Sequence, residues 1–266
     1  MLSLVVGVPT VAAGVPLQPR PLIPVQSLTA GKRGAQLASA NWGGYALISP
    51  TASTSIAFTH VIGSWKVPSI SCDQSDSSSS SAFWVGLGGF TGNAQMEQIG
   101  TWADCDDVGP ASYFGWYELD GNPALSFALN VRPGDTMTAS VSVTTTNQVT
   151  MTLKNVTRKQ QAVVRKRVAV VDLSSAEWMA EAPTDCSASC AVVPIANFGS
   201  VSMSNLQATA AGPSGSVSGT LTDPAWLAAP IEVSANASTP GTCTPLPTST
   251  GTGFSVAWVA AAQPNC

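Results

Sequence analysis

Carboxylates and amides beside aromatic residues are the side chains of this sequence best suited to chemistry. They gather in four segments, 83–86 (FWVG), 97–102 (EQIGTW), 116–118 (WYE) and 176–181 (AEWMAE). A carboxylate can take a proton from water as a general base, and an amide NH₂ can donate to an oxyanion without titrating. If 176–181 is a strand, Glu177 and Glu181 share one face and Trp178 points to the other.

The spacing of Glu177 and Glu181 bears on what they could do together. Glycoside hydrolysis needs two carboxyl groups about 5–5.5 Å or about 6.5–9.5 Å apart. Four residues along a strand place two Cα atoms about 13 Å apart, which fits neither geometry. Glu181 therefore needs a partner from a neighbouring strand.

The residues needed for several other kinds of catalytic or binding site are missing from the sequence. His60 is the only histidine and lies in a strand-like run, so we interpret it as structural and expect no Ser-His-Asp or Cys-His mechanism. The glycine-rich segment 86–93 (GLGGFTGN) is a turn that no helix follows, and no phosphate-binding or dinucleotide motif occurs. Clustered Cys/His ligands are also missing, so we expect no metal and no cofactor.

The elements that position these residues read as short strands between Gly, Pro, Asn and Ser clusters. We predict strands at 42–48, 56–67, 82–87, 95–102, 112–119, 125–131, 136–143, 148–154, 161–171, 176–180, 201–208 and 254–259. The segments 136–143 and 148–154 alternate strongly and predict one hairpin with a solvated face, whereas 210–223 reads as a Gly/Ser-rich connection. This pattern predicts an all-β fold, an antiparallel sandwich or barrel.

Composition narrows the class of protein. Charged residues make up 10% of the 266, and Gly (23) and Pro (19) are abundant, which excludes a coiled coil and a charge-rich disordered chain. From Asn41 onward, eight basic residues stand against fifteen acidic ones. A low charge density with an acidic excess suits a secreted protein that works in acid.

A basic run stands out against this acidic background. It holds six of the eleven basic residues: Lys154, Arg158, Lys159, Arg165, Lys166 and Arg167. Because the run lies between strand-like segments, we interpret it as the solvated face of a hairpin and expect no nucleic-acid partner. No apolar stretch approaches the ~20 residues of a membrane span, so we expect no membrane insertion, and we expect a monomer.

Six widely spaced cysteines indicate disulfides in an oxidising compartment. Six cysteines allow 15 connectivities. The local pairs Cys186–Cys190 and Cys243–Cys266, which leave Cys72–Cys105, are the arrangement that we favour.

The ends of the chain suggest two parts. Residues 2–15 are apolar but lack a basic start, as in an incomplete signal sequence, and residues 16–36 are irregular. We predict that residues 1–40 are a residual signal and pro-segment arm, and that residues 41–266 are one domain.

Six motifs follow one another along the chain: Ser39 to Gly44 (SANWGG), Phe83 to Leu87 (FWVGL), Gln98 to Gly100 (QIG), Trp116 to Glu118 (WYE), Ala176 to Glu181 (AEWMAE) and Pro194 to Phe198 (PIANF). In this order they resemble the glutamic peptidase (eqolisin) family. Trp102 departs from the family pattern, which has an acidic residue there.

The resemblance implies a single sandwich of two antiparallel sheets, with a catalytic Gln/Glu dyad on one sheet and endopeptidase activity on polypeptides in acid. Position by position, the dyad falls on Gln98 and Glu181. Trp84, Trp116 and Glu118 correspond to residues that line the family's cleft. Glu181 would activate water, and Gln98 would polarise the carbonyl and hold the oxyanion.

A non-catalytic function remains as an alternative. In a carbohydrate-binding or lectin-like sandwich, Trp84, Trp102 and Trp116 would stack on sugar rings, and carboxylates would bind hydroxyls. Such a module needs exposed aromatic side chains on one face and no preorganised Gln/Glu pair.

Overall fold

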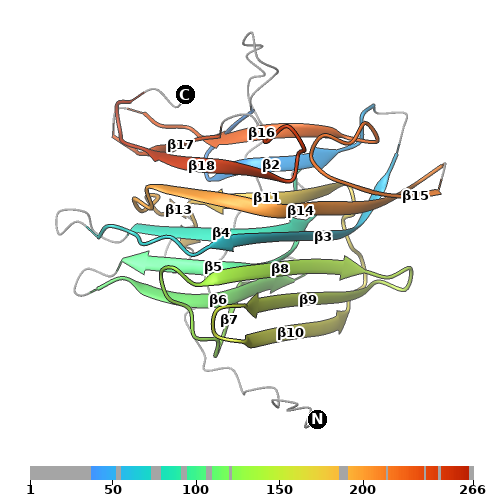
Figure 1. The fold of residues 1–266 in the computed structure, drawn as a ribbon, viewed down its shortest axis with the longest axis horizontal. Helices are drawn as coiled ribbons and strands as arrows, with labels where there is room; N and C mark the ends of the chain where they lie inside the picture. Colours follow the sequence, from blue (N-terminus) through green and yellow to red (C-terminus); the bar gives the residue numbers. More distant parts are fainter. Residues whose placement is uncertain are drawn as a thin grey trace.

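Two large β-sheets stacked face to face make up the fold (Figure 1). The computed structural model describes residues 37–51, 55–72, 79–90, 95–105, 110–119, 122–185, 191–213, 215–236, 238–244 and 247–263. Within these ranges the regular elements are strands, and no helix long and apolar enough to cross a membrane is found. The predicted all-β sandwich of two sheets is confirmed.

The first sheet carries the motifs. Its strand order is β1 (Leu37–Ser39), β16 (Leu227–Val233), β2 (Trp42–Ile48), β11 (Ser175–Glu181), β4 (Ser79–Leu87), β5 (Glu97–Cys105), β6 (Ser112–Leu119) and β7 (Leu125–Phe127). Neighbours pair antiparallel except β1, which pairs parallel with β16. The sheet thus begins four residues before Asn41, the expected start of the domain.

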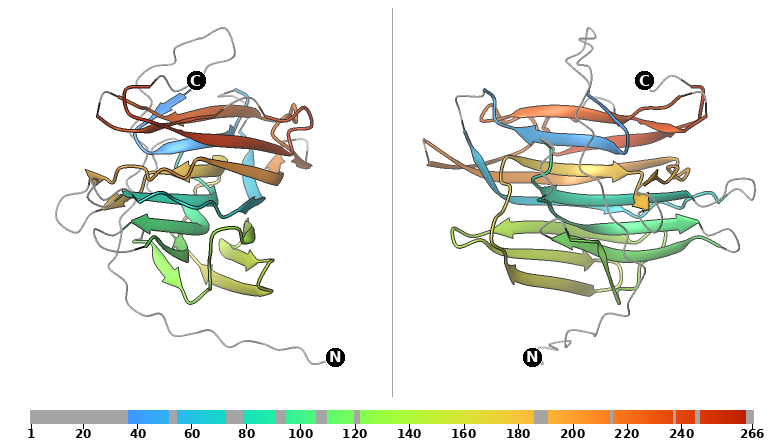
Figure 2. Two further views of the ribbon diagram at one scale, coloured as in Figure 1. Left: turned by 60° about the vertical axis from the view of Figure 1, so that its left-hand side comes forward. Right: turned by 180° about the vertical axis from the view of Figure 1, so that it is seen from behind.

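The second sheet packs against the first and lies in front of it in Figure 1. Its order is β10 (Gln160–Arg167), β9 (Gln148–Asn155), β8 (Thr136–Val143), β3 (Ala57–Lys66), β14 (Ser200–Gly212), β18 (Gly253–Val259) and β17 (Gly241–Cys243), and β15 (Gly215–Gly219) pairs with β14. A short ribbon pairs β12 (Thr184–Asp185) with β13 (Ala191–Val192). The strands of both sheets lie roughly horizontal in Figure 1. Figure 2 shows the two layers after a turn about the vertical axis and from behind.

The main core fills the space between the sheets. Residues of alternating position face inward, such as Phe83, Val85 and Ile99 from the first sheet and Val141 and Met151 from the second. The β8–β9 hairpin alternates buried and half-buried residues, so its predicted solvated face is confirmed. Strict alternation produces this result because successive side chains of a strand point to opposite faces.

Two expectations about strands and connections were wrong, and the predicted strand 161–171 was too long, since β10 ends at Arg167. Residues 210–223 are not a plain connection, since β14 runs to Gly212 and forms a hairpin with β15. The predicted strand 125–131 ends at Phe127. Residues 210–223 are rich in Gly and Ser and carry little period-2 signal, so the partner strand rather than propensity decides their pairing. The strand that begins at Leu125 ends where its pairing with β6 ends.

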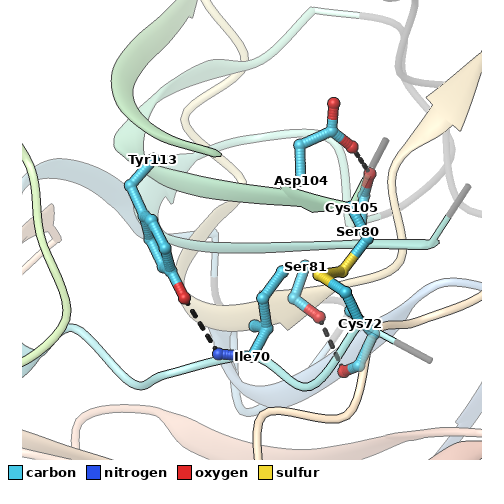
Figure 3. The surroundings of a disulfide bond; sticks show 8 residues. Ile70, Cys72, Ser80, Ser81, Asp104, Cys105 and Tyr113 are labelled. Carbon is cyan, nitrogen blue, oxygen red and sulfur yellow. Dashed lines mark hydrogen bonds between the residues drawn. A yellow bond between two sulfur atoms is a disulfide. The ribbon is translucent and has the colours of Figure 1, made fainter. Parts of the chain in front are cut away.

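A disulfide joins Cys72, which follows β3, to Cys105 at the end of β5 (Figure 3), so this predicted pair is confirmed. Beside it the Tyr113 hydroxyl accepts a hydrogen bond from the Ile70 amide at 3.0 Å. Cys243 is also disulfide-bonded. Residues 186–190 and 264–266 lie outside the described residues, so the pairs Cys186–Cys190 and Cys243–Cys266 stay predictions, as does the arm at residues 1–36.

Candidate functional site

The predicted site residues lie on the outer face of the first sheet, away from the main core. Directly paired residues of antiparallel strands point to the same side. One such row reads Glu177–Gly86–Gln98–Glu118, across β11, β4, β5 and β6. A second row contains Trp84, Gly100 and Trp116, and a third Glu181, Ala82 and Trp102.

Strand β11 therefore divides its side chains as expected. Glu177 and Glu181 belong to the outer face, whereas Trp178 packs in the core and donates from its indole Nε1 to the Ile62 carbonyl at 2.9 Å. A second apolar cluster that includes Trp42, Trp84, Trp102 and Trp116 surrounds the outer-face carboxyls. The carboxyls thus sit in an apolar layer rather than on a wet surface.

Two donors hold the carboxyl group of Glu181. Asn41 donates from Nδ2 to Oε1 at 3.1 Å, and Trp84 donates from indole Nε1 to Oε2 at 2.7 Å. Burial raises the pKa of Glu181 to about 7, and these hydrogen bonds act in the opposite direction. Trp42 meets the Trp84 ring edge to face, with 4.9 Å between centroids, and supports its position.

Gln98 is held by Glu118. Its Nε2 donates to Glu118 Oε2 at 2.7 Å, whereas its Oε1 is buried and has no hydrogen-bond partner among the described residues. Burial raises the pKa of Glu118 well above its usual value, the Gln98 hydrogen bond lowers it, and the charges of Glu181 and Glu97 raise it further. Burial thus favours the neutral form of Glu118, and one Nε2 hydrogen of Gln98 stays available for another acceptor.

Gln98 and Glu181 are separated by strand β4. Their partners on that strand, Gly86 and Ala82, are four residues apart, so a flat sheet would set the two Cα atoms about 13 Å apart along the strands and about 10 Å across them. The Glu181 charge nevertheless raises the pKa of Glu118, the acceptor of the Gln98 amide. Glu181 is therefore electrostatically coupled to the Gln98–Glu118 pair across β4.

Trp84 stands between the two polar groups, and Gly86 makes room for it. A methyl group on Gly86 would lie 2.9 Å from Cζ3 of Trp84 and 3.2 Å from Cβ of Gln98. The benzene edge of the indole therefore lies over Gly86, while its Nε1 reaches Glu181. The absence of a side chain at position 86 is what allows the indole to lie across this row.

Glu181 lines a small pocket. The other residues that line it are Trp102, Trp116, Ala124, Pro183 and Thr184. Trp84, Trp116 and Trp102 are only 1%, 2% and 5% exposed. These three rings form no exposed platform within the described part of the chain, so the structure does not favour the carbohydrate-binding alternative.

Further buried carboxyls accompany the predicted site. Glu97 and Glu177 are fully buried, and burial raises the pKa of Glu177 well above its usual value. Among the described residues, none of the buried charged side chains is a lysine or arginine, and no group of three or more Cys, His, Asp and Glu residues is arranged to hold a metal ion. Glu118, Glu177 and Glu181 thus gather on the outer face without a buried Lys or Arg among the described residues. Glu97, which precedes Gln98 on β5, points to the opposite face.

Sequence reasoning missed two contributors to the site. Asn41 was noted only as part of a motif, and Trp102 only as a departure from the family pattern or a sugar platform. The signal for Asn41 was weak, because its contact with Glu181 spans 140 residues. His60 is where we expected it, on β3 in the second sheet, hydrogen-bonded through Nδ1 with Ser142 Oγ at 2.7 Å.

Comparisons with known proteins agree with this architecture. The sequence profile of the Peptidase A4 family matches residues 40–245. Aspergillopepsin-2 of Aspergillus niger is 30% identical over 195 residues, 65% of this chain and 66% of its own length. Scytalidopepsin B of Scytalidium lignicola is 28% identical over 165 residues, 59% and 58% of the two chains. The chain thus spans less than two thirds of the length of these relatives.

The fold is also similar to a solved structure of a glutamic peptidase. The crystal structure of scytalido-glutamic peptidase with a transition state analog inhibitor superposes with a TM-score of 0.65 and 26% identity. The match covers 83% of this chain and 98% of that one.

Proposed function

This chain belongs to the Peptidase A4 family, and we propose that it is an endopeptidase that hydrolyses peptide bonds with Gln98, Glu181 and one water molecule. The membership confirms the resemblance to the glutamic peptidases that the motifs indicated. The roles of individual residues, the acid optimum and secretion are part of the proposal.

The reaction uses the two polar groups in sequence. The Glu181 carboxylate takes a proton from water, and the water oxygen bonds to the peptide carbonyl carbon. The carbonyl oxygen becomes an oxyanion and accepts the free Nε2 hydrogen of Gln98. Protonated Glu181 then gives its proton to the peptide nitrogen, the C–N bond breaks, and an acid and an amine leave.

One observation carries this proposal: the Gln98 amide is fixed at 2.7 Å by Glu118 and still has one Nε2 hydrogen to offer. A fixed donor costs no reorganisation when negative charge develops on the substrate. Trp84 and Asn41 do the same for Glu181, since each donates to one of its oxygens. Trp116 would contact the peptide from the pocket beside Glu181.

The pH dependence of this mechanism follows from the pKa of Glu181. A general base must be ionised, and a pKa of about 7 would leave few carboxylates in acid. Water and peptide N–H groups that enter the pocket replace lost solvation and lower this pKa. We therefore propose that the hydrated, substrate-accessible site works in acid, as a secreted enzyme.

The decisive experiment compares Gln98→Ala and Glu181→Gln with the unaltered protein on an acid-denatured protein substrate. Loss of one oxyanion donor should lower the rate by about 10² to 10³, and loss of the base should lower it at least as much. Gln207→Ala, at an exposed position of β14, is the matched control and should keep full activity. Near-normal hydrolysis by either site variant would disprove the dyad.

The arm ahead of the domain is proposed to be a removable pro-segment. Arg20, Lys32 and Arg33 give it a positive charge, which suits attachment to an acidic domain. We place the cut before Leu37, because Leu37–Ser39 pairs with β16 in the first sheet. N-terminal sequencing after incubation in acid should find this new terminus, and Glu181→Gln should abolish it if the protein processes itself.

A further inference from the structure

The charges of this chain are divided sharply between two regions. Residues 136–171, which form β8, β9 and β10, contain six of the eleven Lys and Arg residues and none of the fifteen Asp and Glu residues. Only Arg158 among the six is partly neutralised, by a salt bridge to Asp135 at 2.6 Å. The other five are exposed: Lys154, Lys159, Arg165, Lys166 and Arg167. The basic residues are thus concentrated within an otherwise acidic molecule.

The strand register decides where these cations point. Met151 and Leu153 of β9 fill the core, so Thr150, Thr152 and Lys154 face outward. Arg165 pairs with Thr150 and Arg167 with Gln148, so both arginines project from this outer face, about 7 Å apart at their Cα atoms. We call this surface, made by Lys154, Arg165 and Arg167, the basic edge face.

The basic edge face and the candidate site lie on opposite sides of the sandwich. β10 is the last strand of the second sheet, at the lower edge of the molecule in Figure 1. The side chains of Gln98 and Glu181 project from the outer face of the first sheet, which is the other layer (Figure 2). A partner bound to the basic edge face would therefore leave the site open.

We propose that the basic edge face binds a polysaccharide that carries sulfate or phosphate groups and tethers the protein to it with the candidate site turned away. The exposed guanidinium groups match such anions in charge and geometry, because Arg donates bidentately to planar or tetrahedral oxyanions. The hydroxyl groups of Thr150 and Thr152 on the same face suit sugar hydroxyls. Residues 136–171 contain no aromatic side chain on which nucleic-acid bases could stack, which disfavours a single-stranded nucleic acid.

Binding to dextran sulfate, dextran phosphate and unmodified dextran tests the proposal on the full-length protein at fixed pH and varied salt. We expect both charged dextrans to bind and plain dextran not to bind, and their relative affinity distinguishes sulfate from phosphate. Arg165→Gln/Arg167→Gln should lower the affinity at least about tenfold and reduce the slope of log affinity against log salt by about two. Peptide hydrolysis should not change, since neither arginine belongs to the site.

The matched control is Lys66→Gln/Arg132→Gln, which removes the same charge at two exposed positions outside β8–β10. If both double variants weaken binding equally, net charge rather than the basic edge face is responsible, and the proposal is wrong. Tighter binding of single-stranded DNA than of dextran sulfate would also overturn it.

A second pair guards against misfolding of the arginine variant. Lys154→Gln/Lys159→Gln changes no residue of β10, and because it removes Lys154 from the basic edge face it should also weaken dextran sulfate binding. Unaltered binding by this pair together with an unfolded arginine variant would count against the proposal.

Discussion

The indole of Trp84 donates a 2.7 Å hydrogen bond to the carboxyl group of Glu181, across the boundary between β4 and β11. This bond lowers the pKa of Glu181, which burial raises to about 7. Trp84 is thus placed to tune the ionisation of the proposed base as well as to fill the apolar layer around it.

Trp84→Phe should shift the acid limb of activity to higher pH. Without the indole donor the Glu181 carboxylate is less stable, so its pKa rises by about one unit or more, and less of the base is ionised at a given acid pH. The measurement is kcat/KM against pH. Trp178→Phe is the control, because it removes an indole bond to Ile62 on the core side; it should lower stability without moving the acid limb. If the acid limb of kcat/KM does not shift in Trp84→Phe, Trp84 does not influence the ionisation of Glu181.

Two substitutions of Glu118 should distinguish the role of its hydrogen bond to Gln98 from the role of its charge. Burial raises the pKa of Glu118 well above its usual value and so favours its neutral form. Glu118→Gln keeps an oxygen acceptor for the Gln98 amide, so kcat should fall by less than about tenfold. Glu118→Ala removes the acceptor and leaves a buried donor unpaired, at a cost of about 1–3 kcal/mol, and kcat should fall much further. Equal losses in the two variants would show that the Glu118 charge, not its hydrogen bond, is needed.

Gly86→Ala should disturb the site through Trp84. The added methyl group would lie 2.9 Å from Cζ3 of the indole, so the ring must shift and its bond to Glu181 must lengthen. We expect kcat to fall at least about tenfold, with about 1–3 kcal/mol of overpacking cost. In a Trp84→Phe background the same glycine substitution should add little, since its target is already lost.

Gly63→Ala supplies the comparison for Gly86→Ala. Its methyl group would lie 2.7 Å from Cδ1 of Trp178 in the core. A similar loss of stability with normal kcat per folded molecule is expected. If Gly63→Ala lowers kcat equally, the effect of Gly86→Ala comes from destabilisation of the whole fold and not from displacement of Trp84.

Stability should fall as the pH rises from acid through neutrality. The pKa values of Glu118, Glu177 and Glu181 are raised in the folded protein, chiefly by burial. Their contribution to stability is fully present below the ordinary glutamate pKa of about 4, and it is lost as the pH passes the folded pKa values, about 7 for Glu181. Urea unfolding at pH 4, 6 and 8 measures this trend.

Glu177→Gln tests the origin of the trend. The amide stays neutral at every pH, so the variant should lose less stability than the unaltered protein as the pH rises from 4 to 8. At pH 4 both side chains are neutral, and that pH serves as the internal control. A parallel pH dependence in the two proteins would mean that Glu177 does not contribute to it.

The sequence by itself determined the fold class and the faces of most strands. Period-2 alternation predicted 136–143 and 148–154 closely, because one wet and one dry face leave a strong pattern in a strand. The strands 42–48 and 112–119 were also predicted with their observed bounds. Strands such as β15 and β16 were missed, since Gly, Ser and Pro in them carry no such pattern and pairing is set by neighbours.

Only the tertiary structure decided which groups touch. The order of motifs indicated Gln98 and Glu181, but nothing local to them shows that Asn41 and Trp84 share the Glu181 carboxyl or that Glu118 accepts from Gln98. These contacts join strands that are distant in sequence, and strand order in a sheet is fixed by packing of the whole core rather than by any one segment. The raised pKa values have the same origin, because burial of a carboxyl group is a property of everything that is packed around it.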